Sequence, residues 1–551
     1  MSNPRNEPSQ RSTGVFAIVL ILLLAAALRL PGLHWGLPDA LHPGYSWHPD
    51  ELGTLFNARA MAAGELWPIH FIYGGTLYYS LLNAFYHYGR LLGDMLGGVN
   101  DVANAILFGR CFLAACSLLT VLLTWRIGER LFNPATGRLA ALFLALSPAH
   151  AFLAQNMRPD EFATLVALLL VWLGALILQG QPARDWGHFG AAGLLAGFAV
   201  ALRFPLGIFS VAPVLAYLLR ERRAGWKADL AGLLYWRLPL LLVGAALAYA
   251  LASPYSLLRP DLLREGLEVQ KDYQTAPFAD AVGRGPGIYQ YGWLMLQQAL
   301  GIPLHLLALA GVLLAALRWS APRLLLLAPA LAYLIPTTLV SWVVVRYTLP
   351  ILPLLSLLAA DAMVSSAERG PARRRIAATV AACIVAWTLL GDAAFLRIQT
   401  GRNARELATS WIEAHIPKDA SIVEIEQYAQ DVYLNPRIPA GYRHFKFTLD
   451  AGTEGLLLDE SPDHDYIVMN SAIYLNMDRL GVRNPLNGAH KLQEILESGH
   501  YQLATEITLP VRLLGVDYSR QFTSQDFSII NPGERIYRYA DTPTPKASAA
   551  S

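Results

Sequence analysis

Long apolar segments separated by short polar stretches follow one another over the first 396 residues. The first runs from Thr13 to Leu30, close to the roughly 20 residues that a bilayer-spanning helix needs. Further segments of this kind lie near residues 104–125, 138–155, 160–180, 188–203, 204–220, 231–252, 291–316, 323–341, 347–366 and 376–395. Together they predict a mainly α-helical polytopic membrane bundle over residues 13–396, with about eleven crossings plus interfacial helices.

Arginine and lysine concentrate in four of the polar stretches, and short basic loops tend to stay in the cytoplasm. The clusters are Arg126, Arg130 and Arg138; Arg220, Arg222, Arg223 and Lys227; Arg318 and Arg323; and Arg369, Arg373, Arg374 and Arg375. This bias predicts a cytoplasmic N-terminus over residues 1–12. The odd number of crossings then leaves the C-terminus on the extracytoplasmic side of an inner or plasma membrane.

Two segments have the character of interfacial helices. The stretch from Gly74 to Leu92 must begin and end outside if both of the acidic clusters described below are external, as a re-entrant or interfacial helix. Its aromatic and histidine residues suit an interface, namely Tyr73, Tyr78, Tyr79, Tyr86, His87 and Tyr88. The amphipathic stretch from Leu257 to Val269 either steers a lipid-borne substrate or caps the bundle.

From Arg397 the composition changes to that of a soluble domain. Ala404 to Ile416 predicts an amphipathic helix, and Ser421 to Glu426 and Asp465 to Asn470 predict short strands. We therefore expect a small extracytoplasmic α/β domain over residues 397–540, followed by a disordered tail over residues 541–551. Tyrosines of this domain, among them Tyr428, Tyr433 and Tyr474, either help to bind an acceptor or pack the domain's own core.

Composition removes several classes of function. Hydrophobic residues make up 54% of the chain and charged residues 15%, as in an integral membrane protein. The net charge is only +2, so the electrostatic basis for nucleic-acid binding is missing. Cys111, Cys116 and Cys383 all fall inside apolar segments, which argues against a disulfide framework or a zinc site.

Two acidic clusters follow apolar segments on the predicted external face. The first is His48-Pro49-Asp50-Glu51, preceded by Trp47 in a stiff aromatic loop. Such a loop can hold a carboxylate in the geometry that a general base needs, although an interfacial carboxylate is often simply solvated. A divalent metal is the alternative occupant, because imidazole and carboxylates are suitable ligands, but the spacing matches no recognised metal motif.

The second acidic cluster, Arg158-Pro159-Asp160-Glu161, lies on the same predicted face. Its arginine either pairs with a neighbouring carboxylate to neutralise charge or serves a site. Arg203 and Arg346 each stand between apolar residues at a span end, where an arginine snorkels to the interface or meets an anion. Facing inward, these two arginines would form a phosphate clamp, with Tyr347 beside it.

The order of these motifs resembles membrane glycosyltransferases of the C-type superfamily, in the family of protein O-mannosyltransferases and lipid A aminoarabinose transferases. The resemblance covers roughly residues 13–395 and is carried by HPDE, SPAHAFLAQNMRPDE, ASPYSLLRPD and RYTLPILPLLSLLAA, while the tail motif TSWIEAHIPKDASI also resembles bacterial members. It implies a sugar donor on a polyprenyl phosphate. By matching residues, Asp50 would be the base, with Glu51 beside it, and the remaining matched residues would bind the donor: His48, Arg158, Asp160, Arg203, Arg346 and Tyr347.

These observations predict transfer of a sugar from a polyprenyl-phosphate donor to an extracytoplasmic protein, lipid or glycan, inverting the anomeric centre. The absence of a Gly-rich nucleotide-binding loop agrees with a lipid-borne donor. A transporter or flippase is the rival class, since many spans with inward-facing arginines also fit anion translocation. A purely structural scaffold is the third interpretation, but it leaves the acidic loops unexplained.

Overall fold

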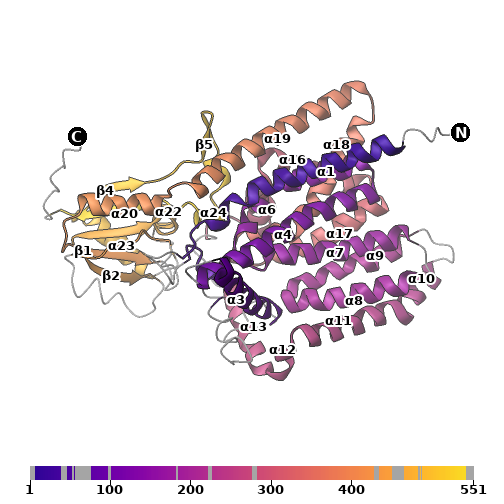
Figure 1. Cartoon of the computed structure of the whole chain (residues 1–551), viewed down its shortest axis with the longest axis horizontal. Helices are drawn as coiled ribbons and strands as arrows, with labels where there is room; N and C mark the ends of the chain where they lie inside the picture. The colour runs from indigo at the N-terminus through magenta and orange to yellow at the C-terminus, as the bar shows by residue number, and fades with distance from the viewer. Residues whose placement is uncertain are drawn as a thin grey trace.

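A helical bundle and a smaller α/β domain, joined by one long helix, make up the computed structural model (Figure 1). The structure describes residues 7–38, 46–51, 55, 76–96, 101–180, 184–220, 226–275, 282–426, 434–449, 464–481, 484 and 487–540. The predicted tail over residues 541–551 lies outside these residues, as do Tyr73, Tyr428 and Tyr433.

The bundle contains α-helices and several short 3-10 or π-helical turns. Its first half is α1 (Glu7–Arg29), η1 (Pro31–His34), α3 (Leu77–Leu96), α4 (Asp101–Leu131), α5 (Pro134–Ala145), α6 (Pro148–Phe152), η2 (Leu153–Gln155), α7 (Asp160–Gln179), α8 (Asp185–Leu202), η4 (Phe204–Ser210) and α9 (Val211–Leu219). Its second half is α10 (Trp226–Gly232), η5 (Leu233–Arg237), α11 (Leu238–Ala252), α12 (Pro254–Leu258), α13 (Pro260–Thr275), α14 (Gly287–Tyr289), η6 (Gln290–Met295), α15 (Leu296–Leu300), α16 (Ile302–Leu317), α17 (Ala321–Thr337), η7 (Val345–Ile351), α18 (Leu352–Ala367) and α19 (Pro371–Thr400).

Helical segments lie over each predicted span, but the number of crossings stays a prediction. Within the described part of the chain, six helices are long and apolar enough to cross a membrane by themselves. The bent pairs α5–α6 and α16–α17, with bends of 65° and 119°, raise the number to eight if each is one span. The predicted span over residues 204–220 is a shorter apolar helix, and α8 does not meet both criteria. The bends fall between Ala145 and Pro148 and between Leu317 and Ala321, where hydropathy continues but the backbone turns.

Helix α3 lies over the segment expected to be re-entrant or interfacial. It is not among the span candidates within the described residues. It packs on the first half of α4, where Tyr88 stacks on Phe108 and Phe85 contacts Phe112. Figure 1 shows α3 at the end of the bundle that faces the α/β domain. Contact with only one end of α4 agrees with a helix that does not cross the whole bundle.

Small residues allow helices α8 and α11 to approach closely. A Cβ on Gly193 would lie 2.5 Å from the Leu241 carbonyl oxygen, and one on Gly197 would lie 2.0 Å from that of Ala245. Helices α8 and α11 therefore touch backbone to backbone, the arrangement that small residues give in membranes. This pair holds α11, at the edge of the bundle, against α8 (Figure 1).

The C-terminal domain is a five-stranded mixed sheet with helices on both faces, as the sequence predicted for an α/β domain. Its elements are α20 (Ala404–His415), β1 (Ser421–Glu426), β2 (Arg443–Thr448), β3 (Tyr466–Asn470), α22 (Ser471–Leu480), α23 (Asn487–Glu497), β4 (Tyr501–Ile507), β5 (Arg512–Leu513), β6 (Val516–Asp517), η10 (Ser519–Gln521), α24 (Gln525–Ser528) and β7 (Glu534–Tyr539). The strand order is β2-β1-β3-β7-β4, with β1 parallel to β2 and β3 and with β7 antiparallel to its neighbours.

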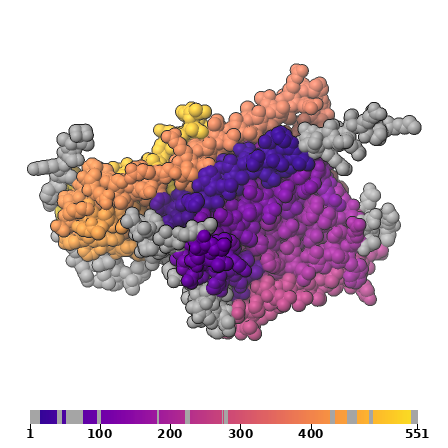
Figure 2. Space-filling model, in the orientation of Figure 1, coloured from indigo at the N-terminus to yellow at the C-terminus, as the bar shows by residue number. Residues whose placement is uncertain are grey.

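Alternate residues of the central strands enter two separate cores. Val423 and Ile425 pack with α22 and α23 on one face, whereas Ile422 packs with Ile412 of α20 on the other. Strand β1 is buried along its whole length because both faces are covered. Figure 2 shows this domain packed against one end of the bundle, with α1 and α19 side by side along the same surface.

Candidate active site

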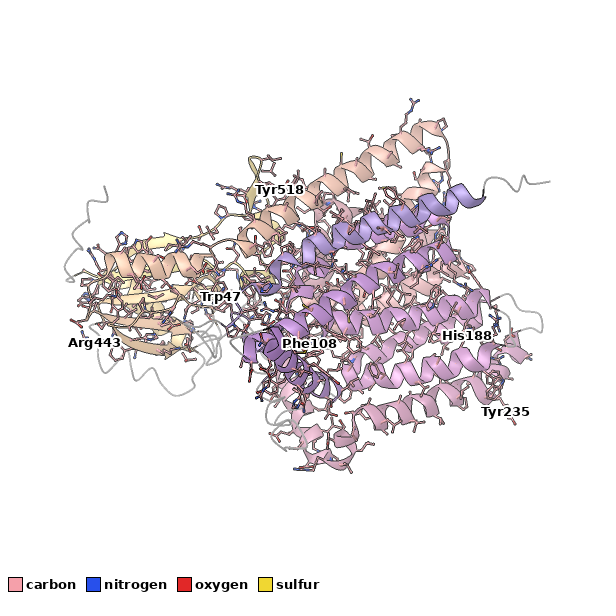
Figure 3. All side chains as sticks on the ribbon, viewed as in Figure 1. Trp47, Phe108, His188, Tyr235, Arg443 and Tyr518 are labelled. Atoms are coloured by element: carbon pink, nitrogen blue, oxygen red, sulfur yellow. The ribbon has the colours of Figure 1, made fainter. Side chains whose placement is uncertain are left out.

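The loop that carries the first acidic cluster folds back on the residues after α1. The Trp47 N–H donates to the Gly36 carbonyl at 3.0 Å, and the Glu51 N–H donates to the His48 carbonyl at 3.2 Å. Gly36 has φ +56°, a conformation that favours glycine. Trp35 and Trp47 meet edge to face with ring centroids 5.7 Å apart. Figure 3 places Trp47 at the boundary between the bundle and the C-terminal domain.

Glu51 anchors this loop to the bundle. Arg110 of α4 donates to both Glu51 oxygens, at 2.9 and 2.7 Å, and neither side chain is exposed. The Ser46 hydroxyl and the Met157 N–H, each at 2.6 Å, complete four hydrogen bonds to the carboxylate. Burial raises the pKa of Glu51, but Arg110 and these hydrogen bonds outweigh that effect and lower it.

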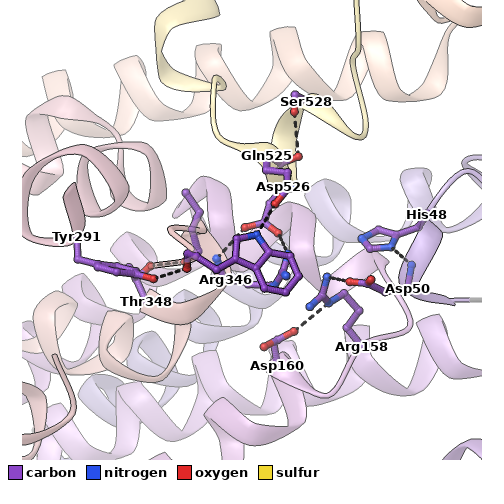
Figure 4. A network of polar contacts seen from close by, with 12 residues as sticks. His48, Asp50, Arg158, Asp160, Tyr291, Arg346, Thr348, Gln525, Asp526 and Ser528 are labelled. Carbon is purple, nitrogen blue, oxygen red and sulfur yellow. Dashed lines mark hydrogen bonds and ion pairs between the residues drawn. The ribbon is translucent and has the colours of Figure 1, made fainter. Parts of the chain in front are cut away.

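Asp50 points toward Arg158 instead (Figure 4). Its side chain is 32% exposed and forms an ion pair with Arg158. Burial raises the pKa of Asp50, but the nearby Arg158 and Arg346 guanidinium groups lower it to about 2, so the carboxylate is ionised at neutral pH. Two adjacent carboxylates thus have different surroundings, one enclosed and one open.

His48 supports the backbone of Asp50. Its ring is buried, and Nδ1 accepts a hydrogen bond from the Asp50 N–H at 3.3 Å. Burial is the main cause that lowers the pKa of His48 to about 4, so the imidazole is neutral. Within the described residues, no group of three or more His, Cys, Asp or Glu side chains is placed to hold a metal ion.

The ion pairs continue from Asp50 through the second acidic cluster. Arg158 also contacts Asp160 at 3.2 Å (Figure 4). The other oxygen of Asp160 pairs with Arg203. Asp160 begins α7 and Arg203 follows the end of α8, so helix termini present both side chains at the same end of the bundle. Asp50, Arg158, Asp160 and Arg203 form one chain of alternating charge.

Glu161, next to Asp160, belongs to a separate buried cluster. Its carboxylate lies 3.4 Å from His150 Nε2, and His150 Nδ1 lies 2.8 Å from the Arg29 guanidinium. Ser117 accepts from Arg29 at 2.7 Å. The second acidic pair is therefore divided like the first, with one carboxylate at the open chain of charges and the other inside the bundle.

Tyr347 joins the two arginines that the sequence predicted as a phosphate clamp. The Arg203 guanidinium lies 5.2 Å from the Tyr347 ring centroid, and that of Arg346 lies 5.6 Å from the same centroid. Arg346 is buried and pairs with Asp526 of the C-terminal domain, with Nη1 and Oδ1 2.6 Å apart. Figure 4 shows Asp526 reaching Arg346 on the side away from Asp160.

The structure brings all eight predicted site residues to one end of the bundle, next to the C-terminal domain. Four of them form the chain of alternating charge, namely Asp50, Arg158, Asp160 and Arg203. Three more lie beside it, namely His48, Arg346 and Tyr347. Glu51 lies behind them on Arg110. Sequence reasoning missed Arg110 and Asp526. An arginine inside the apolar run of α4 was the available signal for the first, whereas Asp526 carries none.

Comparison with known proteins supports the predicted resemblance. Residues 99–257, less than a third of the chain, match the family described as dolichyl-phosphate-mannose-protein mannosyltransferase. Over this segment the chain is homologous to glycosyltransferases. This homology confirms the predicted resemblance and the prediction that the protein is a glycosyltransferase. No curated protein matches the chain.

The fold is similar to that of a solved oligosaccharyltransferase. The oligosaccharyltransferase of Archaeoglobus fulgidus, tethered with an acceptor peptide, matches with a TM-score of 0.50 and 14% identity over 87% of this chain and 72% of that one. ArnT from Cupriavidus metallidurans, bound to undecaprenyl phosphate, has a TM-score of 0.47 and 13% identity over 98% of this chain and 100% of that one. At 14% identity, the likeness to the oligosaccharyltransferase concerns the fold alone.

Proposed function

We propose that this membrane protein transfers a sugar from a polyprenyl-phosphate donor to an extracytoplasmic acceptor, with Asp50 as the general base. The observation that carries the proposal is the open position of Asp50 at the edge of a cluster of three arginines. The matched family, described as using dolichyl-phosphate mannose, supports a lipid-linked donor. The acceptor is a hydroxyl group of a protein, a lipid or a glycan.

The arginines suit the departing half of the donor. A sugar on a polyprenyl phosphate is a phosphodiester, and breaking the bond between the sugar and the phosphate oxygen adds negative charge to the leaving phosphate. Arg203 and Arg346, on either side of Tyr347, are placed to bind that phosphate, and Arg158 lies between them and Asp50. Fixed cations in a partly dry site stabilise developing charge more strongly than water does.

Asp50 supplies the complementary half of the reaction. The acceptor oxygen attacks the anomeric carbon while its proton passes to the Asp50 carboxylate, and polyprenyl phosphate leaves from the opposite face. This single displacement inverts the anomeric centre. Binding of the anionic donor offsets the field of the arginines, which raises the pKa of Asp50 and makes it a better base.

Glu51 holds the catalytic loop in this mechanism. With four hydrogen bonds from Arg110, Ser46 and Met157, its carboxylate is fully occupied by the protein. Its attachment to α4 fixes the position of the neighbouring Asp50. We assign Glu51 a positioning role rather than contact with the substrate.

The test is turnover by the full-length protein in proteoliposomes supplied with a panel of polyprenyl-phosphate sugars and external acceptors. We expect one donor to be consumed and the sugar to appear on the acceptor with inverted anomeric configuration. Retention of configuration would overturn the single displacement. Movement of the intact lipid-linked sugar across the bilayer, with no bond broken, would replace the transferase by the transporter.

A further inference from the structure

Arg346 receives its strongest contacts from a different domain. Asp526 accepts from Arg346 Nη1 at 2.6 Å with one oxygen and from the Arg346 backbone N–H at 3.0 Å with the other. Both side chains are at least 97% buried. Asp526 therefore fixes both the backbone and the guanidinium of Arg346 at the beginning of η7.

Polar contacts fasten the segment that carries Asp526 to the bundle. The Gln298 side-chain oxygen accepts from the backbone N–H groups of Thr523 and Ser524, at 3.1 and 2.6 Å. The Trp342 indole N–H donates to the Gln525 side chain at 2.8 Å. Two residues that precede Arg346 in the chain, from different parts of the bundle, thus bind the same short segment.

An aromatic cluster seals this attachment. Phe522 stacks on Phe395 of α19 with centroids 4.4 Å apart, and Phe527 meets the same ring edge to face at 5.5 Å. Phe152 of α6 contacts Phe395 at 4.7 Å. Phe395, Phe152 and Phe527 are fully buried, so displacing the segment would expose apolar surface and leave buried polar groups without partners.

We infer that Asp526 is a positioning residue that holds Arg346 toward the donor phosphate, which makes the C-terminal domain a structural part of the donor site. This inference rests on the proposed function. The Nε of Arg346 is buried and makes no hydrogen bond within the described residues, so the guanidinium retains a donor for an anion. Asp526 also neutralises one of three arginines brought together, as Asp50 and Asp160 do for the others.

A competing arrangement makes the opposite prediction. If Asp526 merely occupied the phosphate position and left when the donor arrived, removing its charge would strengthen donor binding. If Asp526 holds Arg346 in place, removing its charge weakens binding. The number and burial of the contacts around residues 522–527 favour the second arrangement.

The experiment compares wild type, Asp526→Asn and the matched control Asp517→Asn, whose side chain is 44% exposed in the same domain. Undecaprenyl phosphate binding to the purified full chain is measured together with turnover, so that binding still reports on Asp526 if no donor in the panel is consumed. We expect Asp526→Asn to weaken binding and lower kcat/KM about tenfold, and Asp517→Asn to change neither. Unchanged or tighter binding in Asp526→Asn would overturn the inference.

A double-mutant cycle separates positioning from general destabilisation. In an Arg346→Gln background, Asp526→Asn should change binding less than about twofold, because its effect passes through Arg346. An additional tenfold loss in that background would contradict this role. If Asp526→Asn is not recovered folded, Gln525→Leu tests the same attachment with both charges retained. It should weaken binding about threefold, and unchanged binding would overturn the inference.

Discussion

The two ends of α8 carry charge clusters of the same composition but opposite character. Asp160 pairs with Arg158 and with Arg203, which follows α8, at the end near the C-terminal domain. Asp185, which begins α8, pairs with Arg220 and Arg237 at the other end, where Figure 3 labels His188 and Tyr235. Each cluster is one aspartate between two arginines.

The second cluster is closed on itself. Asp185 is fully buried and each of its oxygens accepts from Arg220 at 2.9 Å. The Arg237 guanidinium lies 4.0 Å from the Trp236 ring centroid, and Trp236 stacks on Trp186 at 4.0 Å. In the described part of the chain, the ion pairs of this cluster join the ends of helices at one end of the bundle, and aromatic rings lie over the arginines, as expected of a structural cluster.

The first cluster continues beyond its central aspartate. Arg158 leads to the partly exposed Asp50, and Arg203 leads through Tyr347 to Arg346. The presence of charged residues at a helix end therefore does not distinguish a functional site from a structural ion-pair cluster. What distinguishes them is whether the ion pairs include a partly exposed carboxylate such as Asp50.

Replacing the open carboxylate gives the largest expected effect. Asp50→Asn should lower kcat about a thousandfold, because a positioned general base contributes about 10² to 10⁴ in rate. The thermal midpoint should change by only a few degrees, since Arg158 keeps Asp160 as a partner. Turnover with reconstituted protein measures the first and thermal denaturation the second. A fully active variant would mean that another group is the base.

Replacing Glu51, the enclosed neighbour of Asp50, should lower both the rate of turnover and the stability of the protein. Glu51→Gln leaves Arg110 buried without a charged partner, which should lower the free energy of unfolding by about 3 kcal/mol and the rate about a hundredfold. Denaturation and turnover of the same preparation test this. A loss of rate with full stability would instead place Glu51 in the chemistry.

Arg158 should control the pH range of activity. With the pKa of Asp50 at about 2, wild-type kcat/KM should not fall through titration of this group between pH 5 and pH 8. Arg158→Gln removes the nearest cation while burial still raises the pKa, so the loss of the ionised base moves to higher pH. We expect the rate of Arg158→Gln to be about tenfold lower than that of wild type. Its activity should also be lost on the acidic side of the profile at a higher pH than in wild type. Coincident pH profiles would contradict this assignment.

Replacing Asp185 in the second charge cluster should have the smallest effect on activity. It tests the expectation that this cluster is purely structural. Asp185→Asn should keep kcat/KM of the folded enzyme within about twofold of wild type while lowering the thermal midpoint by a few degrees. Turnover normalised to folded protein provides the measurement. A hundredfold loss of kcat/KM at full stability would show that this end of α8 also takes part in function.

Much of this organisation was predictable from local pattern. Apolar length located the helices, and the motifs at their ends identified the residues that meet at the open cluster, because span ends on one side must lie close together. Hydropathy could not give the number of crossings, since it does not report the bends after Ala145 and near Arg318. The roles of the site residues remain predictions.

Partner choice within the site was not predictable. Nothing local distinguishes Asp50 from Glu51, because their difference arises from Arg110 on another helix. Asp526 lies in a polar segment of a soluble domain, where an aspartate is ordinary, and only the folded arrangement brings it to Arg346. These pairings depend on tertiary contacts between distant parts of the chain.

The contact between Arg346 and Asp526 also sets an order of events during synthesis. The two residues are 180 positions apart, with Asp526 the later. At about 5 to 20 residues per second, a ribosome needs on the order of 10 to 40 s to make the intervening chain. During that interval the newly inserted bundle holds Arg346 without its counterion. The contact that fixes Arg346 therefore forms only after the segment that carries Asp526 has been made and has folded against the bundle.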